Sequence, residues 1–220
     1  MSRPPARQEL AGIIEHTLLK PDATRGDIEQ WCAEAKAHGF FSVVVHSSRV
    51  AQAVHLLDGT EVKVTAAVAL PWGASDADVK RFETEVAVDF GAHFVELAVN
   101  LGHLKDGDDA AALRELRDVV EAADERPVGL RLDITRLTSE EIRRAAKLAV
   151  DGGAKGVTVA GGADLDTVLQ AVGLVHEVTG PDLGLKVDCD ASEVSSIVRL
   201  LDAGATRFGL TDSVRLIEQT

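Results

Sequence analysis

Residues 138–161, TSEEIRRAAKLAVDGGAKGVTVAG, contain one complete helix–turn–strand unit of this chain. Thr138 and Glu141 have the spacing of a capping box, in which two side chains satisfy backbone donors in the first turn of a helix. Apolar residues then recur at helical intervals, and Gly153 can end the helix in the left-handed conformation. The β-rich run that follows predicts a strand over residues 156–161. The stretch therefore predicts a helix that turns back into a sheet.

This unit recurs along the whole sequence. Gly-Ala pairs precede the next β-rich run at Gly91-Ala92, Gly153-Ala154 and Gly204-Ala205. Eight such runs are predicted as strands, with helix-length segments between them: 12–18, 41–47, 63–70, 93–100, 128–134, 156–161, 183–189 and 206–211. Strands separated by helices pair in parallel through right-handed crossovers, in either an open sheet or a closed barrel.

The number of units favours the closed barrel. No glycine-rich phosphate loop follows the first predicted strand, which weakens the open nucleotide-binding sheet. A length of 220 residues, 45% of them hydrophobic, suits one large core. We therefore predict the α/β class, with a single (β/α)8 TIM barrel over residues 1–220.

Composition limits the partners. The formal net charge of −13 argues against nucleic acid and anionic membranes, because both would repel the protein. No apolar run reaches the roughly 18 to 20 residues of a membrane span, and the N-terminus lacks the apolar stretch of a signal peptide, so we expect a cytoplasmic protein. Cys32 and Cys189 are the two cysteines, and neither belongs to a pair with metal-ligand spacing. We expect a small-molecule substrate, with no metal and no cofactor.

Polar residues gather on the predicted inner face of the barrel and at its strand ends, where active sites of such barrels lie. They are Glu15, His46, Glu96, Asn100, Arg131, Asp133, Thr158, Lys186 and Asp188. A barrel interior is normally filled by branched apolar residues, so these side chains must either pair with one another or line a site.

Four segments resemble signatures of the deoxyribose-phosphate aldolases. They are IEHTLLKPDAT at 14–24, LPWGA at 70–74, VELAVNLGHLK at 95–105 and GAKGVTVAGG at 153–162, the last of which resembles the stretch that holds the family's Schiff-base lysine. The resemblance runs from about Ile14 to the C-terminus. It implies a TIM barrel in which a lysine amine condenses with a carbonyl substrate, while a carboxylate and a second lysine assist proton transfer.

Carried over by position, this resemblance implies that Thr158 occupies the nucleophile position, Glu96 the position of the acid–base aspartate and Lys186 that of the second lysine. Threonine cannot form an imine. Lys155 lies three residues before Thr158 and so on the other side of the strand, where we expect it to face a helix or solvent.

The phosphate site of the family also differs. Asp188 and Asp190 follow Lys186 where the family has a glycine-rich loop, and Asp212 lies in the eighth-strand loop. Three carboxylates would repel a phosphate dianion, so we expect a substrate without phosphate. Asp190 and Asp212 also precede predicted helices, where aspartate often serves as an N-cap. Trp72 can either stack on a substrate or pack at the rim.

The predicted catalytic residues are Lys186, Glu96, Asp188 and Asp133. The predicted substrate-binding residues are Glu15, His46, Asn100, Arg131, Thr158, Asp190, Asp212 and Trp72.

The favoured function is that of a diverged aldolase-family enzyme in specialised metabolism. It would act on a non-phosphorylated carbonyl or amine-bearing compound by lyase or cyclase chemistry, with Lys186 and Glu96 as acid–base or relocated Schiff-base groups. A non-covalent cyclase, isomerase or dehydratase that uses the acidic pocket is one alternative, and a non-catalytic binding protein is another. Family members are commonly dimers or monomers, so a homodimer is one expected assembly.

Overall fold

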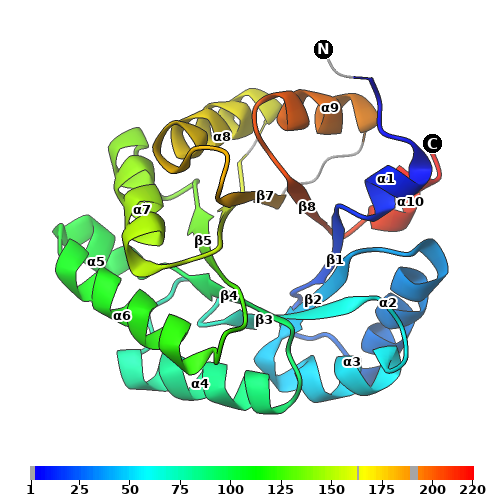
Figure 1. Ribbon diagram of the computed structural model, residues 1–220, viewed down its shortest axis with the longest axis horizontal. Helices are drawn as coiled ribbons and strands as arrows, with labels where there is room; N and C mark the ends of the chain where they lie inside the picture. The colour runs from blue at the N-terminus through cyan, green and yellow to red at the C-terminus, as the bar shows by residue number, and fades with distance from the viewer. Residues whose placement is uncertain (1–2, 163, 189–192) are drawn as a thin grey trace.

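The computed structural model describes residues 3–162, 164–188 and 193–220. Eight parallel strands close into a barrel in sequence order, and helices form a ring around it (Figure 1). Helices α1 and α10, at the two ends of the chain, contact each other beside the joint between the first and last strands. The predicted (β/α)8 barrel is confirmed.

Every strand lies inside the range predicted for it. The strands are β1 (Ile14–Leu18), β2 (Ser42–His46), β3 (Lys63–Val68), β4 (Phe94–Ala98), β5 (Val128–Asp133), β6 (Gly156–Ala160), β7 (Gly184–Asp188) and β8 (Arg207–Leu210). The helices are α1 (Arg7–Ala11), α2 (Arg25–His38), α3 (Val50–Leu57), α4 (Ala77–Asp89), α5 (Leu101–Asp106), α6 (Asp109–Ala122), α7 (Ser139–Gly152), α8 (Leu165–Thr179), α9 (Val194–Asp202) and α10 (Ser213–Ile217), with a 3-10 turn, η1 (Ser47–Arg49), before α3.

Helix α7 begins and ends as its sequence predicts. The Thr138 hydroxyl accepts a hydrogen bond from the Glu141 backbone, and the Glu141 carboxylate accepts one from the Thr138 backbone at 2.7 Å. Gly153 ends the helix at a φ of 83°, in the left-handed region. Both ends are therefore stabilised by local contacts, and an N-cap of this kind contributes about 1 kcal/mol.

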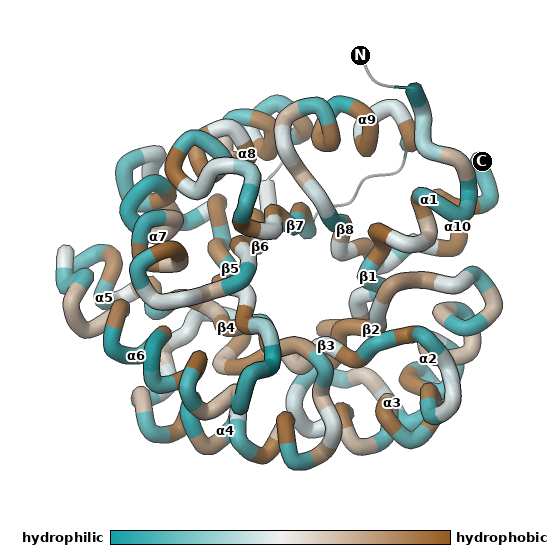
Figure 2. The backbone as a smooth tube through the Cα atoms, in the orientation of Figure 1, coloured by the Kyte–Doolittle hydropathy of each residue, from teal (hydrophilic) through white to brown (hydrophobic). Residues whose placement is uncertain are grey.

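The apolar core lies between the outer face of the barrel and the helices. Val157 and Val159 of β6 are buried in this core, whereas Thr158 between them points into the barrel. Hydrophobic segments run along the strands and recur along the surrounding helices (Figure 2). Side chains alternate along a strand. One half of them therefore packs in the core, and the other half lines the barrel lumen.

Among the helices that the structure describes, none combines the length and the apolarity of a membrane span.

Candidate active site

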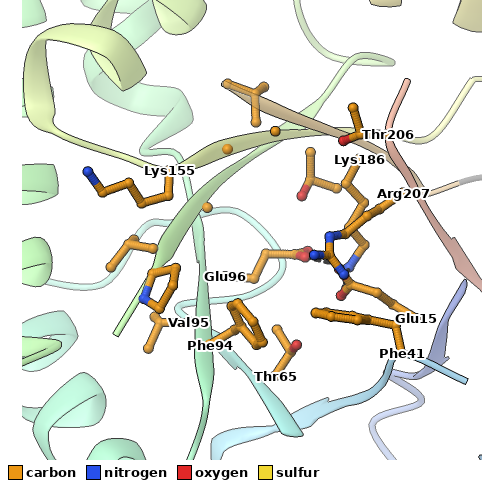
Figure 3. Close-up of a pocket in the computed structure, with 17 residues that line it drawn as sticks. Glu15, Phe41, Thr65, Phe94, Val95, Glu96, Lys155, Lys186, Thr206 and Arg207 are labelled. Carbon is orange, nitrogen blue, oxygen red and sulfur yellow. Dashed lines mark hydrogen bonds and ion pairs between the residues drawn. The ribbon is translucent and has the colours of Figure 1, made fainter. Parts of the chain in front are cut away.

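Lys186 of β7 lies at the centre of the barrel lumen. Its ammonium nitrogen Nζ donates hydrogen bonds to Oε2 of Glu96 at 2.6 Å and to Oε2 of Glu15 at 3.0 Å (Figure 3). All three side chains are buried. Strands β1, β4 and β7 thus bring together three predicted site residues that are far apart in the sequence.

Arg131 of β5 extends this group. Its Nη1 donates a hydrogen bond to Oε1 of Glu96 at 2.6 Å and forms an ion pair with Asp188 at the end of β7. We call Glu15, Glu96, Arg131, Lys186 and Asp188 the lumen cluster. Two cations face three carboxylates, so the cluster carries one net negative charge when every member is ionised.

Strand register places the cluster in one part of the lumen. Lys186 pairs with Thr158 of β6, and Thr158 pairs with Arg131 of β5, so the three inward side chains stand side by side. On the other side of β7, Gly209 of β8 leaves room for the lysine: a Cβ there would lie 2.7 Å from Cε of Lys186. Glycine at this position therefore allows the long side chain to cross the lumen.

Lys186 and Glu96 are both ionised at neutral pH. Burial acts to lower the pKa of Lys186, but the charges of Glu15, Glu96 and Asp188 outweigh burial and hold that pKa well above its usual value. Burial likewise acts to raise the pKa of Glu96, but Lys186 and Arg131 together lower it to about 2. The resting amine is thus an ammonium ion beside a carboxylate.

Asp133, a predicted catalytic residue, lies apart from the lumen cluster. Its Oδ1 accepts hydrogen bonds from the Thr135 backbone and hydroxyl, and its Oδ2 accepts one from Nε of Arg136. These contacts hold the turn after β5, so in this structure the carboxylate is engaged locally at the barrel rim.

Asn100 lies outside the lumen, at the start of α5. Its side-chain oxygen accepts a hydrogen bond from the His103 backbone, and its Nδ2 donates one to Glu115 of α6 at 3.2 Å. Glu115 also accepts a hydrogen bond from Lys80 of α4 at 2.5 Å, and Lys80 is completely buried. This Lys80–Glu115 pair is not predictable from the sequence pattern, because a lysine on an amphipathic helix normally lies on the exposed face.

The other predicted residues lie around the rim. Nε2 of His46 lies 3.1 Å from the Leu19 carbonyl, consistent with a hydrogen-bonded wall residue. Trp72 is 52% exposed. Asp212 is at the N-cap position of α10, where its side chain makes no capping hydrogen bond. Asp190, like Cys189, lies outside the described residues.

Thr158 is buried in the lumen, and Lys155 is exposed at the opposite, N-terminal mouth of the barrel. No group of three or more histidine, cysteine, aspartate or glutamate side chains is placed to hold a metal ion within residues 3–162, 164–188 and 193–220.

Similar proteins are found by sequence and by structure, although no protein-family model matches the chain. The deoxyribose-phosphate aldolase of Geobacillus sp. strain WCH70 is 39% identical over 211 residues, which is 95% of each protein. A crystal structure from Coccidioides immitis, assigned as a deoxyribose-phosphate aldolase, superimposes with a TM-score of 0.91 at 28% identity, over 99% of this chain and 88% of that one. The tetrameric deoxyribose phosphate aldolase of Aeropyrum pernix superimposes with a TM-score of 0.86 at 24% identity, over 97% and 92% of the two chains, and shows the same fold.

These relatives correct the function predicted from the sequence. Curated relatives that are 35–39% identical over nearly their full length carry the name deoxyribose-phosphate aldolase. The prediction of a diverged lyase or cyclase of specialised metabolism on a non-phosphorylated compound is therefore wrong. The prediction gave too much weight to single positions such as Thr158 and Asp188, whereas similarity extends over 95% of the chain. The chain belongs to the deoxyribose-phosphate aldolase family of lyases.

Proposed function

We propose that the chain catalyses reversible aldol cleavage of a deoxyribose phosphate, with Lys186 as the reacting amine. One observation carries this proposal. Among the described residues, Lys186 is the lysine whose amine lies inside the barrel lumen, and two carboxylates accept hydrogen bonds from it. The substrate class comes from the names of the relatives.

The lumen cluster supplies the proton transfers that such a reaction needs. Transfer of one proton from Nζ of Lys186 to Glu96, across 2.6 Å, leaves a neutral amine. This amine adds to the substrate carbonyl, and the proton on Glu96 leaves with the hydroxyl group as water, which yields an iminium ion. A carboxylate then removes the proton of the substrate hydroxyl, and the carbon–carbon bond breaks as its electrons pass to the iminium.

We propose further that Thr158 occupies the position that holds the nucleophilic lysine elsewhere in the family. The segment around Thr158 resembles the lysine-bearing segment, and Thr158 pairs with Lys186 on the neighbouring strand. An amine on β7 therefore reaches the same part of the lumen as an amine on β6.

Borohydride trapping tests the role of Lys186. The protein is incubated with deoxyribose 5-phosphate or acetaldehyde, reduced, and analysed by intact mass and peptide mapping. We expect one reduced adduct on Lys186, none in Lys186→Met, and an unchanged adduct in Lys155→Met, which removes the lysine at the opposite mouth. Turnover of deoxyribose 5-phosphate that persists in Lys186→Met, or an adduct on another lysine, would overturn the proposal.

The related structure from Aeropyrum pernix is described as tetrameric, and we propose that this chain also self-associates, with a homodimer as its smallest unit. Val79 and Phe82, three residues apart on α4, are 55% and 65% exposed, and neighbouring exposed apolar side chains are typical of contact surfaces between proteins. Sedimentation velocity measures the assembly directly, and a monomer at all concentrations would refute self-association.

A further inference from the structure

The N-terminal mouth of the barrel holds a cavity of about 250 Å³ (Figure 3). Residues at the starts of the strands line it, among them Phe94 of β4, Val128 of β5 and Arg207 of β8. Glu96 and Lys186 close its inner end. The cavity therefore opens on the side of the barrel opposite to the strand ends where active sites of TIM barrels lie.

A row of three glycines keeps this part of the lumen hollow. Gly129, Gly156 and Gly184 pair in register across β5, β6 and β7, and all three line the cavity. A Cβ on Gly156 would lie 2.9 Å from the Gly184 carbonyl oxygen, so this position requires glycine. The nearest atoms to a Cβ on Gly129, apart from the adjoining residues, would be the carbonyl oxygens of Gly156 and Val95 at 3.9 Å, so a side chain there would enter the cavity.

Arg207 presents an unused hydrogen-bonding group to this cavity. Its guanidinium carbon lies 3.3 Å from the centroid of the Phe41 ring and 6.0 Å from that of Phe94. Within the part of the chain that the structure describes, no group accepts a hydrogen bond from the guanidinium, and Glu15 acts on it electrostatically without forming an ion pair. Stacking on Phe41 occupies a face of the guanidinium and leaves the N–H donors at its edge available.

The charges around the cavity favour a single negative charge in the ligand. Three cations line it, Lys155, Lys186 and Arg207, against two carboxylates, Glu15 and Glu96. Glu15 and Glu96 already bind Lys186, so the guanidinium of Arg207 is the cation left for a ligand inside the mouth. The remaining surface is mainly apolar, with Phe41, Phe94 and Pro127 among its residues.

We propose that this cavity binds a small monocarboxylate with a flat, apolar body. Arg207 binds the carboxylate through two parallel hydrogen bonds, as guanidinium groups do, and the apolar body lies along the glycine row and Phe94. The two negative charges of a dianion would exceed the one excess positive charge of the residues that line the cavity. The volume is below the roughly 300 to 1,000 Å³ of pockets for drug-sized ligands, so the ligand is about the size of a benzoate.

Isothermal titration calorimetry with benzoate tests the site. We expect saturable binding at one site per chain, and binding about tenfold weaker or worse in Arg207→Gln, which removes a charged hydrogen-bonding partner. Gly129→Leu should abolish binding by filling the cavity while every charge stays in place. Arg114→Gln is the matched control, because it removes the charge of an exposed arginine on α6.

Two further probes make the test sharper. Benzamide, which has the same shape but no charge, should bind as weakly to the unmodified protein as benzoate binds to Arg207→Gln. Crystals soaked in 4-bromobenzoate should give an anomalous bromine peak between Phe94 and the glycine row.

Several results would overturn the proposal: no saturable benzoate binding, equal binding in Arg207→Gln or in folded Gly129→Leu, equal affinity for benzamide, or tighter binding of inorganic phosphate at this mouth. None of these measurements uses substrate or turnover. Absence of benzoate binding would therefore leave the proposed role of Lys186 as the reacting amine untouched, and loss of that role would leave benzoate binding untouched.

Discussion

Glu96 and Lys186 are joined by a 2.6 Å hydrogen bond that crosses the barrel lumen from β4 to β7. Both groups are buried, and each needs the other because an unpaired buried charge is strongly destabilising. Glu96 also binds Arg131, so one carboxylate holds two cations in place. Charged residues thus take the space that apolar side chains fill in an ordinary barrel.

Replacement of Glu96 by glutamine should therefore destabilise the fold markedly. We expect Glu96→Gln to lower the free energy of unfolding by about 3 to 5 kcal/mol, because Lys186 and Arg131 both lose a carboxylate partner. Glu15→Gln, which breaks only the hydrogen bond to Lys186, should cost less. Urea denaturation measures both values, and an equal or larger loss in Glu15→Gln would contradict the central position of Glu96.

Acid should destabilise the protein over the pH range in which Glu96 becomes protonated. Its pKa falls from 4.5 to about 2 on folding, so the carboxylate contributes stability above pH 4.5 that is lost as the pH falls toward 2. The contribution is roughly 3 kcal/mol. Urea denaturation between pH 2 and pH 7 should show this loss, and Glu96→Gln should reduce it. An identical acid profile in the variant would refute the assignment to Glu96.

Burial also lowers the pKa of His16, so this histidine is held neutral in the folded protein. The stability that the neutral side chain of His16 contributes is present above about pH 6.5, and it decreases as the pH falls below that value. The loss due to His16 begins near pH 6.5, whereas the loss due to Glu96 begins near pH 4.5, so the same titration detects their onsets in turn.

Thr158→Lys should increase imine trapping if Lys186 is the reacting amine. The new lysine would stand in register with Lys186, and a second ammonium group nearby lowers the pKa of both amines. We expect faster borohydride-trapped adduct formation, divided by peptide mapping between positions 158 and 186. Thr158→Met, which adds length without an amine, is the control. An equal increase in this control would show that the effect does not come from the amine.

The buried pair of Lys80 and Glu115 gives a prediction outside the lumen. Lys80→Met should lower the free energy of unfolding by about 3 to 5 kcal/mol, because Glu115 remains buried without its main cation. The double variant Lys80→Met/Glu115→Leu should recover much of this loss, since replacing both partners by apolar residues is often neutral. Urea denaturation that shows additive losses in the double variant would contradict this explanation.

The sequence predicted the strands and the inward-facing polar residues on most of them, because those features depend on neighbouring residues. Alternation of Val157 and Val159 with Thr158 is visible without any tertiary contact, and so is the capping box of Thr138 and Glu141. The alternation also places Asp133 inward at the end of its strand. That its carboxylate binds Thr135 and Arg136 in the turn after β5 is known only from the structure.

The sequence by itself determined the eight-unit barrel, the polar character of the lumen and the family resemblance. Each of these depends only on the local spacing and the order of the residues. Only the tertiary structure decided that Lys186 is an ammonium ion held by Glu15 and Glu96, partners 171 and 90 residues away. It also decided that Lys80 is buried and that three glycines align into the wall of a cavity. The physical reason is the same in each case: burial, charge pairing and strand register depend on which distant residues the closed barrel brings together, and no local pattern specifies them.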